Sequence, residues 1–360
     1  MVGWVILACW LCVQPWARWP AWSAEVSHRL TLLACTVMLG LWQLGRFSPQ
    51  RLPRAWLAWV AALLVVMLWH LREALTSGDY FTFFVETAVL SNGIATALTS
   101  AFGLWALLQW RSLRAVRWFG LALLVANLMV ALPQAWRGGW STGDWHAMNV
   151  GGLLGMERFL GTYAVAWLPI CLVWSPWLAI LPLALILLAH KPLLLFGAVV
   201  SCWALLGRRV RTLVIAGGLA AVWWMWPLVL GQKLAQRGLT WWHGLQASAA
   251  RPFAGWGFDP MTMSDLRQAH GFILPSFHSD WLALSVFAGW VVALWAAWLW
   301  WRVVSVVPRT RWASACRGSL LAIGVLALVQ GTVSQARIAG LALVLLAWWS
   351  LEQRQESSHA

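Results

Sequence analysis

Long apolar runs separated by short polar segments fill almost the whole chain. The runs are roughly 15–22 residues long, the length at which a helix crosses a hydrocarbon core about 30 Å thick. We therefore expect an all-α fold, a polytopic transmembrane helix bundle, in which residues 1–360 form a single integral membrane domain. The pattern predicts about twelve spans, at residues 2–16, 30–45, 55–71, 88–110, 118–136, 159–174, 177–190, 192–207, 212–230, 281–301, 318–333 and 337–351.

Composition favours the same class of protein. Hydrophobic residues make up 61% of the chain and charged residues 10%, too few charges to cover a soluble protein of 360 residues. The 34 Trp also fit a membrane protein, because the indole ring suits the membrane interface. A β-barrel would instead show short segments of alternating hydrophobicity. The N-terminus lacks the basic region of a cleaved signal peptide, so we expect a retained first span.

The arginines lie in alternate loops. One set of loops is rich in arginine and almost free of acid, whereas the other set mixes both signs. Arginine-rich loops stay in the cytoplasm, so we expect both termini there and the other set in the periplasm. This topology explains the net charge of +14, and no nucleic acid is expected as a partner. The arginine-rich set contains Arg46, Arg51, Arg54, Arg111, Arg114, Arg117, Arg208, Arg209, Arg211, Arg302, Arg309, Arg311 and Arg317.

Residues 231–280 form the longest polar stretch, and we expect a periplasmic loop there that carries most of the site. Arg237 and Arg251 lie in this stretch, and Arg158 and Lys191 lie at span ends on the same side. Arginine binds phosphate oxygens through two parallel hydrogen bonds, so these residues are candidates for a phosphate or pyrophosphate site. The alternative is interfacial anchoring, in which long basic side chains reach the lipid headgroups. Lys191 also marks a break between two apolar runs, and such breaks often line a cavity.

His278 lies directly before the span that begins near Trp281. An imidazole can accept a proton from an attacking hydroxyl, because histidine titrates near neutral pH. The alternative is a helix start, in which Ser279 or Asp280 caps the span and His278 is incidental. The two interpretations are compatible, because a cap would also fix the direction of the histidine.

The segment Gly255-Trp256-Gly257, after Pro252, predicts a tight turn whose backbone approaches another group closely. It is not a dinucleotide-binding fingerprint, because no strand, glycine turn and helix surround it. The chain also has no P-loop, no paired Cys/His zinc spacing and no Asp-x-Asp pair. The sequence therefore argues against a nucleotide-sugar enzyme and a tightly held metal, and we expect no cofactor.

Taken together and in their order along the chain, the arginine, glycine and histidine segments described above resemble the O-antigen ligase and polymerase superfamily of bacterial envelope proteins. The resemblance covers roughly residues 150–300 and includes Arg158-Phe159-Leu160-Gly161. Ser279 stands where the family usually has Asn, and His190-Lys191 stands where it often has Ser-Arg. The other segments that carry the resemblance are Arg237, Trp242, Pro252, Gly255-Trp256-Gly257-Phe258, His278-Ser279-Asp280-Trp281-Leu282 and Gly289.

The resemblance implies transfer of a glycan from undecaprenyl pyrophosphate to an acceptor hydroxyl, at the periplasmic face of the bacterial inner membrane. The acceptor is a lipid A–core sugar for a ligase, which we favour, a growing glycan for a polymerase, or a pilin side chain for a protein O-oligosaccharyltransferase. It implies His278 and Arg237 as catalytic residues, and Lys191, Arg158, Arg251, Gly255, Gly257, Trp242 and Asp280 as substrate-binding residues.

Two other classes of protein stay open. A transporter of lipid-linked oligosaccharides would carry charges inside its spans, around a central cavity. A non-catalytic scaffold of the envelope would leave the ordered motifs of residues 231–280 unexplained.

Overall fold

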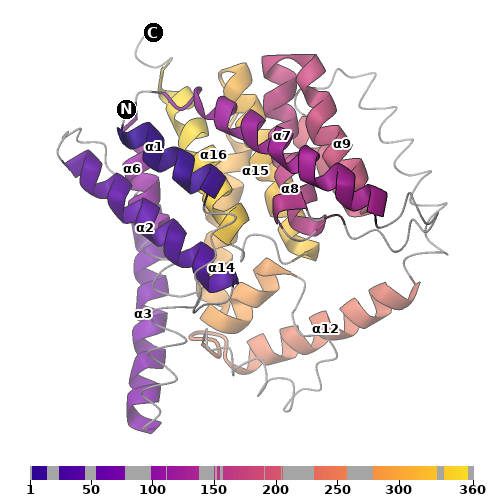
Figure 1. Cartoon of the computed structure of the whole chain (residues 1–360). Helices are drawn as coiled ribbons and strands as arrows, with labels where there is room; N and C mark the ends of the chain where they lie inside the picture. The colour runs from indigo at the N-terminus through magenta and orange to yellow at the C-terminus, as the bar shows by residue number, and fades with distance from the viewer. Residues whose placement is uncertain are drawn as a thin grey trace.

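The computed structural model is helical in every element of the residues it describes: 2–13, 24–44, 54–77, 99–110, 112–137, 150, 152–154, 157–189, 191–203, 205, 231–257, 279–330 and 336–355. Figure 1 shows a bundle in which α12 lies across the end opposite both termini. The elements are α1 (Val2–Ala8), η1 (Cys9–Val13), α2 (Ala24–Leu44), α3 (Arg54–Ser77), η4 (Thr99–Gly103), α6 (Leu104–Leu108), α7 (Val116–Ala135), η7 (Gly152–Leu154), α8 (Glu157–Trp174), η8 (Pro176–Ala179), α9 (Ile180–Leu188), α10 (Pro192–Cys202), α12 (Gly231–Ala250), α14 (Asp280–Ser305), α15 (Arg311–Val329) and α16 (Ala336–Gln355).

Three of the described helices, α7, α14 and α15, are long and apolar enough to cross a membrane. All three expose large apolar side chains, among them Met129 on α7, Leu294 and Trp301 on α14, and Leu328 on α15. Such surfaces suit contact with lipid rather than water. The all-helical class and its membrane-spanning helices therefore agree with the sequence. The count of twelve spans stays a prediction, because residues 212–230 and 88–98 lie outside the described residues.

The centre of the bundle is α15, which packs against α8, α10, α14 and α16. Small residues let these helices approach closely. A side chain at Gly318 would collide with the carbonyl oxygen of Ser201, and one at Gly161 would collide with Leu194. The hydroxyl of Ser319 donates to the carbonyl oxygen of Ala166 on α8 over 2.5 Å. These contacts place the first turns of α8 and α10 beside each other.

α15 begins at Arg311 rather than near residue 318, so the expected start of this span is wrong. Thr310 caps the helix, because its hydroxyl accepts a hydrogen bond from the amide of Ala313 over 2.9 Å. Arg311 and Arg317 therefore lie in the first turns of a helix and not in a loop. Hydropathy missed these turns because their arginines lower the average.

Two of the arginine-rich loops meet at one end of the bundle, around Glu352 of α16. This carboxylate accepts from Arg114 Nε and Nη2 over 2.7 and 2.8 Å, and from the hydroxyl of Thr310 over 3.1 Å. Arg309 donates to the carbonyl oxygen of Gln353. Two loops that the sequence assigned to the same side, 112–115 and 306–310, therefore share one end. Glu352 itself is buried.

Candidate functional site

The first part of the polar stretch 231–280 is helical, where the sequence predicted a loop. α12 covers residues 231–250 and packs against the start of α14. Ala247 is buried at this contact, and the Trp256 indole donates to its carbonyl oxygen over 2.7 Å. The helix ends where Pro252 and Gly255 follow, two residues that favour a turn.

The predicted glycine turn is present, and the group that it approaches is the backbone of α14. Gly255 and Gly257 have φ of 67° and 92°. α14 is interrupted at Gly289, whose φ of 84° and ψ of 166° are not helical. The amide of Trp256 donates to the carbonyl oxygen of Val286 over 2.8 Å, and that of Gly257 to the carbonyl oxygen of Phe287 over 3.0 Å. In return, the amide of Trp290 donates to the carbonyl oxygen of Pro252 over 2.7 Å. The turn thus satisfies backbone groups that the interruption leaves without helical partners.

His70 on α3 holds this turn from the other side, and the sequence interpretation did not include it. Its Nε2 lies 2.8 Å from the carbonyl oxygen of Ala254. A carbonyl only accepts, so Nε2 carries the proton in this hydrogen bond. A side chain at Gly257 would lie 3.3 Å from the His70 ring. The signal for His70 was an ionisable residue at the end of an otherwise apolar run.

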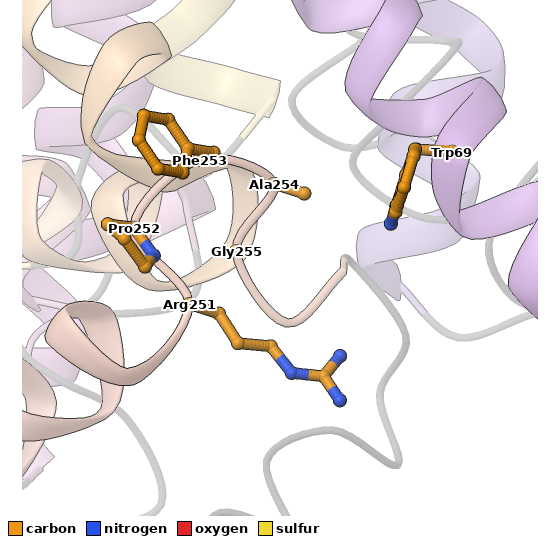
Figure 2. A pocket seen from close by; sticks show the side chains of 6 residues that line it. All are labelled: Trp69, Arg251, Pro252, Phe253, Ala254 and Gly255. Atoms are coloured by element: carbon orange, nitrogen blue, oxygen red, sulfur yellow. The ribbon is translucent and has the colours of Figure 1, made fainter.

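A small open pocket of about 190 Å³ lies between the turn and α3. Trp69 approaches it from α3 and Arg251 from the start of the turn, as Figure 2 shows. The Arg251 guanidinium lies over the Trp256 ring, 4.4 Å from its centroid. Gly255 also lines the pocket, so two predicted substrate-binding residues, Arg251 and Gly255, meet here.

Arg158, in the first turn of α8, and Arg237, on α12 beside the last turn of α15, form a second group. Arg237 Nη1 donates to the carbonyl oxygen of Val329, in the last turn of α15, over 3.4 Å, a long hydrogen bond. Burial, and then the charge of Arg158, lower the pKa of Arg237. The Arg158 guanidinium lies over the Phe159 ring, and its buried Nε has no hydrogen-bond partner among the described residues. Two cations therefore lie near enough for the charge of one to act on the other, and both are half-buried.

The place of Arg158 is set by two polar side chains of α7. Asn127 Oδ1 accepts from the amide of Leu153 over 3.0 Å, and Gln134 Oε1 accepts from the amide of Gly152 over 2.8 Å. Both amides belong to η7, directly before α8, and Gly152 has a φ of 54°. The polar residues inside α7 therefore hold the chain where α8 begins.

Lys191 lies at the N-cap position of α10 and is exposed. Leu194, one turn later, packs on Gly161, one turn after Arg158. The starts of α8 and α10 are therefore neighbours, and Lys191 lies at the same end of the bundle as Arg158.

His278 lies outside the described residues, as do His190 and Arg267. Ser279 caps α14, because its hydroxyl accepts from the amide of Leu282 over 3.3 Å. The cap that the sequence assigned to Ser279 or Asp280 is therefore formed by Ser279. Asp280 is the first residue of α14, and its role in binding stays a prediction.

The expected site is divided into two groups. Arg237 and Arg251 are separated by fourteen positions, most of them helical, or about 20 Å at 1.5 Å per residue. Arg251, Gly255 and Gly257 therefore lie at the interruption of α14, away from Arg237 and Arg158. Trp242 is exposed on the outer side of α12.

No family model matches the sequence, and no curated protein matches it. The case for a function therefore depends on the chemistry of these two groups.

Proposed function

We propose that the protein is a membrane-bound glycan transferase that moves a glycan from undecaprenyl pyrophosphate to an acceptor hydroxyl. A lipid A–core sugar is the favoured acceptor, as in an O-antigen ligase. The observation that carries this proposal is the pair of cations formed by Arg158 and Arg237.

Arginine keeps its charge at every physiological pH, so the pair remains doubly positive even though the pKa of Arg237 is lowered. Two like charges at a half-buried position repel each other, and an anion bound between them would offset that repulsion. Among the described residues, Arg158 is the charged group that acts on the pKa of Arg237. A diphosphate has the charge and the oxygen geometry that two guanidinium groups bind.

The reaction needs stabilisation of the leaving group and a route for one proton. The acceptor oxygen attacks the anomeric carbon, the bond from that carbon to the diphosphate oxygen breaks, and the lipid diphosphate leaves. Arg158 and Arg237, with Lys191 at the same end, would stabilise the charge that develops on the diphosphate. His278 would take the proton of the acceptor hydroxyl, and Gly255 to Gly257 would hold the neighbouring backbone in shape.

The test is a deletion of the gene in its host, with envelope glycans analysed by gel and mass spectrometry. For a ligase, lipid A–core loses its polymer while polymer still accumulates on the undecaprenyl carrier. Single repeat units on lipid A–core indicate the polymerase, and an unglycosylated pilin with unchanged lipopolysaccharide indicates the protein transferase. Lipid-linked glycan held at the cytoplasmic leaflet indicates a transporter, and unchanged glycans indicate a scaffold; either result would overturn the proposal.

Complementation with variants then tests the site. We expect Arg237→Gln and His278→Ala to restore protein in the membrane but not the glycan. Arg309→Gln is the matched control, because Arg309 is an exposed arginine at the opposite end of the bundle. Full transfer by both Arg237→Gln and His278→Ala would contradict the site assignment.

A further inference from the structure

The outward side of α12 is apolar. Leu239, Trp242 and Leu245 are 48%, 58% and 41% exposed. They follow one another at three-residue spacing, so they lie on one face of the helix. The other exposed residues of this face, where side chains are described, are Gly238, Gln246, Ala249 and Ala250, and none of them is charged.

The inward side of α12 has the opposite character. Thr240 and Ser248 are buried against the protein, together with Gly244 and Ala247. Arg237 also lies toward this side, where burial lowers its pKa. A helix that packs on a protein and faces water shows the reverse arrangement, with its apolar stripe inward and its charges outward.

The surroundings identify what covers the outward face. α12 packs on α14, one of the helices long and apolar enough to cross a membrane. α14 itself exposes Leu294 and Trp301, so the helix on which α12 packs also has a surface that suits lipid. Phe253, just after α12, is another apolar side chain that the protein leaves uncovered, 77% exposed. Figure 1 shows α12 lying across the end of the bundle, as a helix in the plane of a membrane interface would.

We propose that α12 is an interfacial helix, whose face formed by Leu239, Trp242 and Leu245 lies among the headgroups and upper acyl chains of the bilayer that surrounds the bundle. Helices of this kind insert their apolar face about 5–10 Å into that boundary, and tryptophan suits this depth. Residues 231–250 are then a membrane-bound helix and not part of a solvated loop. This lipid contact does not depend on transfer activity, and its test requires none.

The test is spin-label accessibility in lipid nanodiscs, because 34 Trp rule out reading a single tryptophan by fluorescence. The six cysteines are first replaced by serine or alanine, and Trp242→Cys and Leu245→Cys are labelled in that background. Leu294→Cys, exposed on α14, is the reference for the acyl region. Arg309→Cys, exposed at the other end of the bundle, is the reference for water.

We expect both α12 labels to be more accessible to oxygen than to a water-soluble nickel chelate, at a depth between the two references. Accessibility to nickel equal to that of the Arg309→Cys label would show that the face is in water and would overturn the proposal. A label immobilised and shielded from both reagents would show that protein covers the face, either a second copy or a partner, and would overturn it as well.

Discussion

At one end of the bundle Arg114 donates two hydrogen bonds to the buried carboxylate of Glu352, whereas at the other end the charge that acts on Arg237 is a second arginine, Arg158. Arg114 lies between two helices and Arg237 lies within α12. The two arginines differ in the charged group that lies near each of them. Glu352 is 1% exposed and also accepts from Thr310 and Trp348, so the charge of Arg114 is balanced within the protein.

Arg117 shows a third arrangement, at the same end as Arg114. Its guanidinium lies over the rings of Trp174 and Trp312, 4.8 and 5.4 Å from their centroids. Aromatic faces attract a cation without neutralising it. Phe159 offers such a face to Arg158, but phenylalanine attracts cations less strongly than tryptophan. At one end, Glu352 and the tryptophan rings act as partners of Arg114 and Arg117, whereas no carboxylate lies against Arg158 and Arg237 among the described residues. The proposed anion would supply that missing partner.

The largest expected effect is on transfer, from Arg237→Gln. Loss of one donor to a developing charge costs about 100–1000-fold in rate. The same change removes repulsion from Arg158, so the melting temperature should stay constant or rise. Transfer is measured in purified membranes with lipid-linked donor, and melting in detergent. A fall in melting temperature with unchanged transfer per folded molecule would give Arg237 a purely structural role.

The next effect is on stability, from Gly289→Ala. The φ of 84° and ψ of 166° at Gly289 lie in a region that other residues avoid, and the new methyl group would meet the carbonyl oxygen of Phe253. Strain of this kind costs about 1–3 kcal/mol. Gly40→Ala is the matched control, because nothing lies within 4 Å of the added methyl group. Equal melting temperatures for both variants would show that the interruption of α14 is not required.

Arg114→Gln reverses the result expected for Arg237→Gln. The buried Glu352 loses its cation, and breaking such a pair costs about 2 kcal/mol here, less than for a fully buried pair because Arg114 is 46% exposed. We expect a lower melting temperature in detergent and unchanged transfer per folded molecule. Arg309→Gln, which removes an exposed arginine nearby, should leave both unchanged. Loss of transfer without loss of stability would break the contrast between the two ends.

The smallest effect is local, from His70→Leu. Loss of its hydrogen bond to Ala254 costs about 1 kcal/mol, so the fraction of molecules with an open turn should rise about fivefold. Hydrogen exchange of the Trp256 and Gly257 amides, followed by mass spectrometry, measures that opening. An unchanged exchange rate would show that α14 alone holds the turn.

The sequence predicted the features that depend on local chemistry. The apolar runs predicted helices where α3, α7, α8 and α16 are found. Pro252 and the two glycines predicted the turn, and Ser279 predicted the cap of α14. Each of these follows from a few neighbouring residues.

The features that depend on tertiary partners were not predictable. α12 was taken for a loop, because its polar residues were read as facing water when several of them pack on the protein. His70 and Glu352 acquire their roles only from Ala254 and Arg114, which are distant in the sequence. The separation of Arg251 from Arg237 follows from the helix between them.

Binding of the lipid carrier tests the central claim most directly. Purified protein in nanodiscs is titrated with undecaprenyl pyrophosphate and with undecaprenol, and bound lipid is counted by native mass spectrometry. We predict that the wild type prefers the pyrophosphate by at least about tenfold, or 1.4 kcal/mol. The Arg158→Gln/Arg237→Gln double variant should lose this preference, while an Arg309→Gln variant keeps it. A preference that survives in the double variant, or that the wild type lacks, would contradict an anion site between these two arginines.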